Sequence, residues 1–218
     1  PVTTAAHSLS PPARAEARIS MLIEMMSTLS RTTDPKARLD LFFDTMRKMW
    51  GVKGYIGVAC AGLPPGRYRI VRHQASDGRN VIPHVAFEEE ERVRVCDRGW
   101  LGSICEEGRP RLFRDLRVAD DPVLGDAIAE YRSAIAAPIF EAGEVARWAV
   151  LFEHEPDAFS DSDLEAFVLR ANLVGTAIEN LRQAEALRKA HEQIHRDVDR
   201  IAHIQRSLLP GVIPEVPG

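Results

Sequence analysis

The sequence predicts an α+β fold in which helices flank a central antiparallel sheet, with a long helix at each end of the chain. Three observations predict it. Helical periodicity dominates before residue 50 and after residue 160, and strand-like runs lie between them. Those runs come in pairs joined by glycine-containing turns, which is typical of antiparallel hairpins. Helices grouped at both ends of a set of strands are characteristic of the α+β class.

The N-terminal region is expected to hold two helices. Residues 1–11 look disordered, and apolar residues on one face predict a first helix over about 12–29. Asp34-Pro35 then supplies an N-cap and a first-turn proline for a second helix, which stops before Gly51. Residues 1–33 therefore form a disordered start and an N-terminal helix.

Strands are expected next, on either side of a turn at residues 62–66. Residues 54–60 form an apolar run that is typical of a buried strand, and residues 68–72 alternate as a half-exposed strand does. The acidic run from Glu88 to Glu91 is expected to be a solvated loop.

The middle of the chain ends in a hairpin. Residues 99–107 suit a short helix, residues 111–114 a strand, and residues 121–131 a helix capped by Asp121. Residues 134–140 and 145–152 then form two strands around a tight turn, which completes the antiparallel sheet.

The last helix is the most informative feature of the chain. From Asp161 to Leu208 there is no proline and one glycine, Gly175, and apolar residues recur every three or four positions. This pattern predicts one continuous helix, capped by residues 160–163. A domain of this size cannot cover so long a helix, so its first half should pack on the domain and its second half should leave it.

The second half of this helix carries an apolar seam that requires a partner helix. The seam spacing alternates between four and three residues, as in coiled coils, and charges of both signs flank it. The residues expected on the seam are Leu187, His191, Ile194, Val198, Ile201 and Leu208. We therefore expect a parallel homodimer through residues 12–30 and 182–208.

Composition excludes several classes of protein. The net charge of −4 shows no basic bias, so nucleic acid is not an expected partner. No apolar run approaches the roughly 20 residues of a membrane span, and the start of the chain lacks a secretory signal, so a cytoplasmic protein is expected. The cysteines, Cys60, Cys96 and Cys105, lack metal-site spacing and are expected to be small buried hydrophobes.

One metal-like motif lies on the last helix. His191 to His195 reads H-E-x-x-H, the spacing that places two imidazoles on one helix face for zinc. The extended form of the motif would need glycine at position 198 and histidine at position 201, where Val198 and Ile201 stand. We therefore expect a solvated or seam-lining pair and no metal site.

Residues 99–181 resemble a GAF domain. The matching pieces are GWLGSICEEGRP at 99–110, SAIAAPI at 133–139, Trp148 to Leu151 in the hairpin, and AFSDSDL at 158–164. The resemblance covers roughly residues 35–183. It implies a GAF-like sensor domain over 34–181, followed by a coiled-coil signalling helix over 182–209.

A second, shorter resemblance concerns the end of the chain. Residues 204–210, with Ile213-Pro214 and Pro217-Gly218, look like the segment that leads into SpoIIE-type metal-dependent serine phosphatases. The resemblance implies that residues 210–218 begin a linker to a missing catalytic domain, where manganese or magnesium would bind. This chain would then hold no catalytic residue, metal or cofactor, and would regulate the attached serine/threonine phosphatase.

The GAF resemblance also implies a ligand cavity between the sheet and its connecting helices. The candidate lining residues are Tyr55, Trp100, Phe113, Asp115, Tyr131 and Ile135, with Arg72 as an anion contact. The ligand, a small molecule or a protein partner, is not specified, and the pattern typical of cyclic-nucleotide GAF domains is absent. The alternative is that these aromatic residues simply fill the core.

Three other functions fit the same pattern. The sensor could serve a histidine kinase or a diguanylate cyclase, the domain could be a GAF-type methionine sulfoxide reductase, or it could only dimerise. The first is disfavoured by the Arg206 to Pro210 segment. Thiol-dependent turnover would identify the second, and a closed pocket with no room for a ligand would favour the third.

Overall fold

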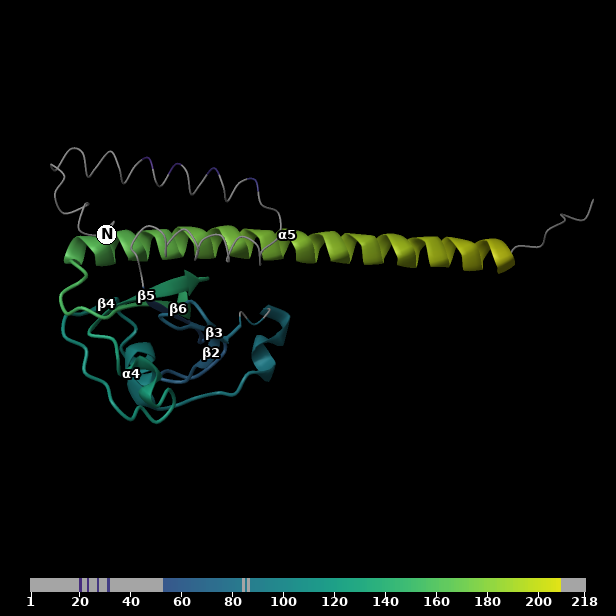
Figure 1. Cartoon of the computed structure of the whole chain (residues 1–218). Coiled ribbons are helices and arrows are strands. Elements are labelled where there is room, and N and C mark those ends of the chain that lie inside the picture. The colour runs from purple at the N-terminus through teal and green to yellow at the C-terminus, as the bar shows by residue number, and fades with distance from the viewer. Residues whose placement is uncertain are drawn as a thin grey trace, which may run out of the picture. The chain divides into compact units, whose positions relative to one another are not determined.

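The computed structural model describes residues 53–83, 85 and 87–208, together with Ser20, Ile23, Ser27 and Arg31, which are helical (Figure 1). The rest of the two expected N-terminal helices and the expected linker at 210–218 lie outside the described residues. The chain divides into two compact units, Pro1–Glu179 and Asn180–Gly218.

The first unit contains a six-stranded antiparallel sheet in the order β3-β2-β1-β6-β5-β4 (Figure 1). The strands are β1 (Gly54–Ala59), β2 (Arg69–Gln74), β3 (Asn80–Ile82), β4 (Arg111–Phe113), β5 (Ser133–Glu141) and β6 (Glu144–Glu153). The predicted hairpin is confirmed as β5–β6. Ala142 and Gly143 turn it with positive φ angles of 51° and 87°, as a two-residue hairpin turn requires. The sequence analysis missed β3.

Within the described residues from 53 onward, the helical segments are η1 (Phe87–Arg92), α4 (Gly99–Glu107), η2 (Asp126–Ile128) and α5 (Asp161–Leu208). The prediction of α4 is confirmed, and Gly108 ends it in the left-handed conformation. The predicted helix over 121–131 is wrong, because residues 121–125 form a tight turn and leave only the short η2. The predicted loop at Glu88 to Glu91 is also wrong, since these residues belong to η1.

Strand β2 is more buried than its sequence suggests. It lies between β3 and β1, so Ile70, Val71, Arg72 and His73 are all buried. A bulge at Val71 shifts the register, so that Val58 pairs with Ile70 but Gly57 pairs with Arg72. The expected half-exposed strand is therefore covered on both faces.

The two faces of the sheet carry separate hydrophobic clusters. One face packs on α4 and the connecting loops, and we call it the α4 face. The other packs on the first half of α5, and we call it the α5 face. Alternate strand residues divide between them: Ala134 and Ala136 lie on the α4 face, whereas Ile135 and Ala137 lie on the α5 face.

Small residues bring α5 close to the sheet. A β-carbon added at Gly175 would lie 2.4 Å from Cγ2 of Ile139, so only glycine fits there. Three residues earlier, the Asn172 side chain accepts a hydrogen bond from the Phe140 amide at 3.0 Å and donates one to the Pro138 carbonyl at 2.8 Å. This explains the lone glycine of the helix and fixes the first half of α5 on β5.

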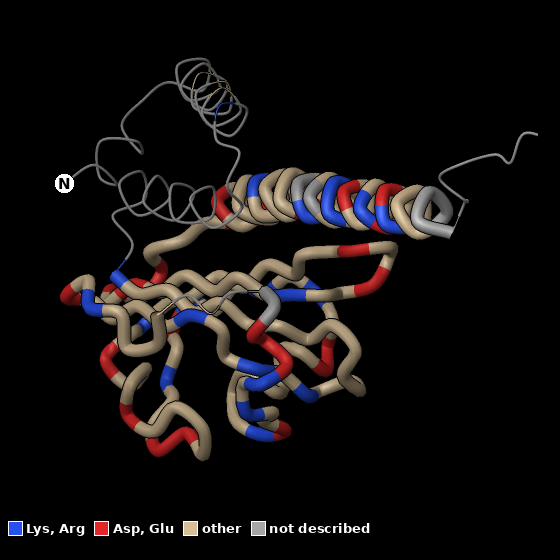
Figure 2. Tube along the Cα trace, turned by 90° about the vertical axis from the view of Figure 1, so that its right-hand side faces the viewer, with Lys and Arg blue, Asp and Glu red and all other residues tan. Residues whose placement is uncertain are grey.

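The second half of α5 differs from the first. The predicted helix over 161–208 is confirmed as one element of 48 residues. Phe167, Ala171, Val174 and Ile178 are buried, whereas no residue between 180 and 204 whose burial is described is buried. Acidic and basic residues alternate along this part of the helix, as Figure 2 shows.

Among the described residues, no helix is both long enough and apolar enough to cross a bilayer.

Candidate functional site

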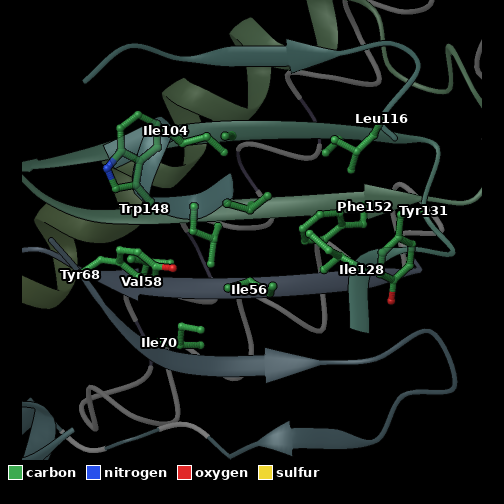
Figure 3. Close-up of a cluster of buried hydrophobic side chains, with 14 residues drawn as sticks. Ile56, Val58, Tyr68, Ile70, Ile104, Leu116, Ile128, Tyr131, Trp148 and Phe152 are labelled. Atoms are coloured by element: carbon green, nitrogen blue, oxygen red, sulfur yellow. The ribbon is translucent and has the colours of Figure 1, made fainter. Parts of the chain in front are cut away.

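An aromatic cluster lies on the α4 face. Two of its members, Tyr131 and Phe152, lie at one end of the buried side chains drawn in Figure 3. The Trp100 ring lies 4.9 Å from the Phe113 ring, edge to face, and 5.6 Å from the Phe152 ring. Tyr131 stacks on Phe152 at 4.9 Å and on His154 at 5.2 Å. Such contacts contribute beyond simple burial and hold the cluster in one arrangement.

Nε1 of Trp148 is a buried polar atom on this face that has no hydrogen-bond partner among the described residues. Trp148 is only 1% exposed, in the middle of the sheet. The nearby Tyr68 hydroxyl, in contrast, donates to the Arg98 carbonyl at 2.8 Å. Buried polar groups are almost always paired, so this unpartnered indole N–H is an unusual feature of the α4 face.

Burial also changes the ionisation of groups on this face. It raises the pKa of the Tyr131 hydroxyl to about 12, so this group stays protonated and can donate a hydrogen bond. It lowers the pKa of His73, which pairs across the sheet with Ile56 on the α4 face, so this imidazole is neutral at pH 7.

The candidate cavity residues do not line one cavity. Trp100, Phe113 and Tyr131 lie on the α4 face, but Tyr55 and Ile135 lie on the α5 face. The single seven-residue pocket is therefore a wrong interpretation. The reason is the two-residue period of a strand, which points Tyr55 and its neighbour Ile56 to opposite faces.

The two charged candidates also lie elsewhere. The Arg72 guanidinium sits 6.0 Å from the centre of the Tyr55 ring, so it belongs to the α5 face and is not an anion contact for the aromatic cluster. Asp115 is exposed and pairs with Arg132 and with Arg117 at 2.9 Å. These two partners hold the pKa of Asp115 below its usual value, which marks a surface ion pair.

Two buried carboxylates have structural roles that were not predicted from the sequence. Asp121 was expected to cap its own helix, but its Oδ2 accepts from the Trp100 amide at 2.7 Å, at the start of α4. Its Oδ1 accepts from the amides of Val123 and Leu124 at 2.9 Å. Asp121 thus fixes the N-terminus of α4 from a distant loop, and only its position before a proline signalled a capping role.

The second missed carboxylate is Glu90 in η1, which pairs with Arg147 on β6. Arg147 also donates to Glu141 at 3.2 Å, and all three side chains are largely buried. Nothing in the acidic run distinguished Glu90 from its neighbours, because its partner lies 57 residues away in the chain.

The cysteines are half-buried, contrary to the expectation of full burial. Cys60 follows β1, Cys105 lies in α4, and their Sγ atoms are 3.6 Å apart. Both pack against the hydrophobic cluster of the α4 face.

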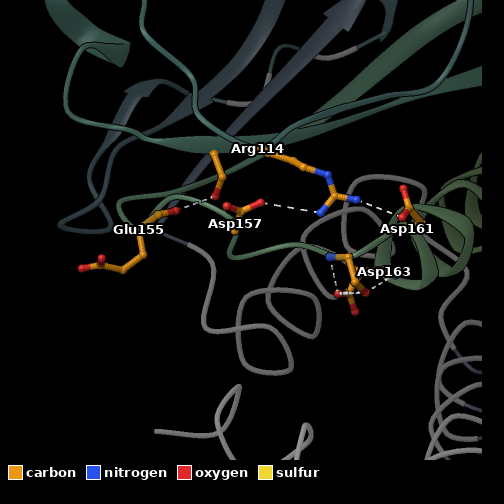
Figure 4. Close-up of polar contacts among 7 residues, drawn as sticks. Arg114, Glu155, Asp157, Asp161 and Asp163 are labelled. Carbon is orange, nitrogen blue, oxygen red and sulfur yellow. Dashed lines mark hydrogen bonds and ion pairs between the residues drawn. The ribbon is translucent and has the colours of Figure 1, made fainter.

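The first turn of α5 is tied to the edge of the sheet by polar contacts (Figure 4). Arg114, directly after β4, pairs with Asp161 at 2.9 Å and with Asp157 at 3.6 Å. Ser160 and Asp163 form the predicted capping box: the Ser160 amide donates to Asp163 at 2.9 Å, and the Asp163 amide donates to the Ser160 hydroxyl at 3.2 Å.

The described side chains expected on the seam are exposed in this chain, with Leu187 at 72% and Ile194 at 60%. Val198 and Ile201 are each 55% exposed. The side chain of Leu208 lies outside the described set. The imidazoles of His191 and His195 meet with their Nε2 atoms 3.0 Å apart. The described residues contain no group of three or more side chains that could hold a metal ion.

Together these features define an α+β domain with one face fixed to a long helix and an aromatic, partly polar opposite face. A family model described as "GAF domain" matches residues 32–179, and the chain belongs to the GAF domain family. No curated protein matches the sequence.

Solved structures share the fold at low sequence identity. The chain resembles the GAF domain of an Acinetobacter phosphoenolpyruvate-protein phosphotransferase, with a TM-score of 0.55 and 14% identity over 78% of this chain and 98% of that one. It also resembles the Neisseria meningitidis free methionine-R-sulfoxide reductase in complex with its substrate, with a TM-score of 0.56 and 17% identity. That match covers 81% of this chain and 96% of the reductase chain. A far-red-absorbing dark-state structure with bound biliverdin IXa matches with a TM-score of 0.52 and 11% identity. That match covers 74% of this chain and 99% of that one.

Proposed function

We propose that this chain is the sensor and dimerisation region of a signalling protein, and that it controls an attached SpoIIE-type serine/threonine phosphatase. Helix α5 is the observation that carries the proposal. Its first half is fixed to the GAF sheet, and its second half presents an exposed apolar seam. A helix of this kind can transmit a change in the domain to a second domain.

The contacts suggest how a signal reaches the helix. Trp100 and Phe113 touch on the α4 face, and Arg114, the residue after Phe113, pairs with Asp161 in the first turn of α5. A ligand that moves the aromatic cluster would therefore act on the start of the helix. It can shift the balance between two arrangements only by binding one of them more tightly.

The α4 face suits a small molecule with an apolar, planar body and a hydrogen-bond acceptor. The aromatic rings would pack on the body, and Trp148 Nε1 would donate to the acceptor. Two of the similar structures were solved with small molecules, a methionine sulfoxide reductase substrate and biliverdin, which supports a ligand in this fold.

Native mass spectrometry of the purified chain, followed by release of bound small molecules, tests the ligand. Trp148→Phe keeps an aromatic ring and removes the unpartnered donor, so it should weaken retention of the ligand about tenfold. The control is Val95→Phe at a partly exposed site, which should leave retention of the ligand unchanged. A chain that retains nothing from cell extract would leave dimerisation as the role of the domain.

The homodimer rests on the seam of α5. Sedimentation of the chain at micromolar concentration should give a dimer, and the double variant Leu187→Glu, Ile194→Glu should give a monomer with unchanged helix content. The control is Lys189→Glu, Arg196→Glu, on the side of the helix away from the seam, which should stay dimeric. A monomeric wild-type chain would contradict the proposal.

The phosphatase requires a longer protein for its test. We expect no manganese-dependent release of phosphate from a phosphoserine peptide by this chain, and release by a natural protein that continues beyond Gly218. Autophosphorylation or cyclic dinucleotide synthesis by that protein would identify a kinase or a cyclase instead. Turnover of free methionine sulfoxide with a thiol reductant would favour the reductase.

A further inference from the structure

A pair of thiols lies on the α4 face, outside the contacts that the proposed function uses. Cys60 directly follows β1 and Cys105 lies near the end of α4, 45 residues further along the chain, yet their Sγ atoms are 3.6 Å apart. Both side chains are half-buried, so small oxidants can reach them. Two sulfur atoms at this distance need only a small approach to form a bond of about 2.05 Å.

The surroundings make the two thiols unequal. When Cys60 is ionised, the Cys105 thiol can donate a hydrogen bond to it, which lowers the pKa of Cys60 more than burial raises it. The Arg147 guanidinium lowers this pKa further, although Glu90 and Glu141 pair with the same guanidinium and weaken its field. The same hydrogen bond and burial raise the pKa of Cys105. Cys60 is therefore the more readily ionised thiol of the pair, and thiolates are the reactive form.

The positions of Cys60 and Cys105 indicate what a disulfide between them would change. The Cys60 amide donates to the Ala146 carbonyl at 2.7 Å, which anchors Cys60 to β6. Cys105 belongs to the helix that supplies Leu101 and Ile104 to the α4 face. A bond between the two sulfur atoms would pin α4 to the centre of the sheet and restrict access to the face where the unpartnered Trp148 Nε1 lies.

We propose that Cys60 and Cys105 form a reversible disulfide in response to a peroxide, and that oxidation is an input to this GAF domain. The Cys60 thiolate attacks one oxygen of hydrogen peroxide, the O–O bond breaks, and the leaving hydroxide takes a proton to become water. The resulting Cys60 sulfenic acid is attacked by the Cys105 sulfur, the S–O bond breaks, and a second water leaves. Two thiols and one peroxide give one disulfide and two waters. The bond does not depend on the proposed function; only its regulatory consequence does.

The test uses the reduced chain and stoichiometric hydrogen peroxide. Two of the three thiols should be lost and regained with dithiothreitol, and peptide mapping without reductant should find Cys60 joined to Cys105. Cys96→Ser, which removes a half-buried cysteine whose pKa is raised by burial, is the matched control and should form the same bond. Cys105→Ser should stop at a sulfenic acid that dimedone traps on Cys60. Cys60→Ser should react at least tenfold more slowly.

Two results would contradict a disulfide between Cys60 and Cys105. One is a bond that involves Cys96 or joins two chains; the other is retention of all three thiols at a peroxide level that oxidises glutathione. The wild-type map alone decides this, so a variant that fails to fold does not affect the outcome. If the disulfide forms but the output of the longer protein is the same in both redox states, oxidation is not an input and that part of the proposal is wrong. Loss of the dimer in both redox states would instead contradict the proposed function.

Discussion

The two faces of the sheet are built differently. The α5 face is lined at its centre by small residues, Ala137 and Ala149, against Ala171 and Gly175 of the helix. The α4 face carries the aromatic cluster, the unpartnered Nε1 of Trp148, the buried His73 and two half-buried thiols. One face thus packs closely on a helix, whereas the other carries polar and sulfur groups.

The largest expected effect comes from emptying the α5 face. Phe167 is fully buried there, and Phe167→Ala should lower the free energy of unfolding by about 3–5 kcal/mol. Leu169→Ala, on the exposed side of the same helix, should change it by less than about 0.5 kcal/mol. Urea denaturation of both variants measures the difference, and equal losses would show that the helix is not anchored through this face.

The next effect compares a glycine on each face. Gly175→Ala places a methyl group 2.4 Å from Ile139 and should destabilise the domain by about 1–3 kcal/mol. Gly102→Ala in α4 meets neighbours only at 3.5 Å or beyond, so it should be neutral or slightly stabilising. Thermal denaturation should thus give shifts of different size or sign. Stabilisation by both changes would mean that α5 does not approach β5 closely.

A pH effect should come from the α4 face. Because burial lowers the pKa of His73, the unfolded chain takes up a proton near the ordinary value of about 6.5 while the folded chain does not. The stability that this neutral histidine contributes is present above that pH and is lost as the pH falls through it. Thermal melts between about pH 7.5 and 5.5 should show a shallower loss for His73→Gln than for the wild type. If the melting temperatures of the two proteins fall in parallel with pH, the His73 side chain is in contact with solvent in the folded chain.

The smallest effect is expected at the polar start of α5. Arg114 and its partner Asp161 are largely exposed, at 50% and 80%, so Arg114→Ala should cost about 0.2–1 kcal/mol in stability. The loss should vanish near 1 M salt, since exposed ion pairs are screened. A loss above 2 kcal/mol that persists in high salt would mean that these contacts hold the helix more firmly than the buried face does.

Local patterns predicted much of this molecule and failed where partners are distant. The hairpin β5–β6, helix α4 and the capping box at Ser160 follow from turn, period and capping signals within a few residues. The roles of Glu90 and Asp121 do not, because each carboxylate pairs with a group more than 20 residues away. The predicted cavity is wrong for a related reason: residue type alone does not show on which face of a strand Tyr55 and Ile135 lie, and both lie on the face opposite Trp100.

By itself, the sequence determined the α+β class and the continuous last helix, because periodicity, turns and capping depend on near neighbours. It indicated the GAF family only through the resemblance of residues 99–181 to that family. Only the tertiary structure decided which half of that helix is covered, why Gly175 interrupts it, and which side chains share a face. Those outcomes depend on how closely a helix approaches a sheet and on strand register. Residues far apart in the chain, such as Cys60 and Cys105, come into contact only when the helix packing and the strand register are both in place.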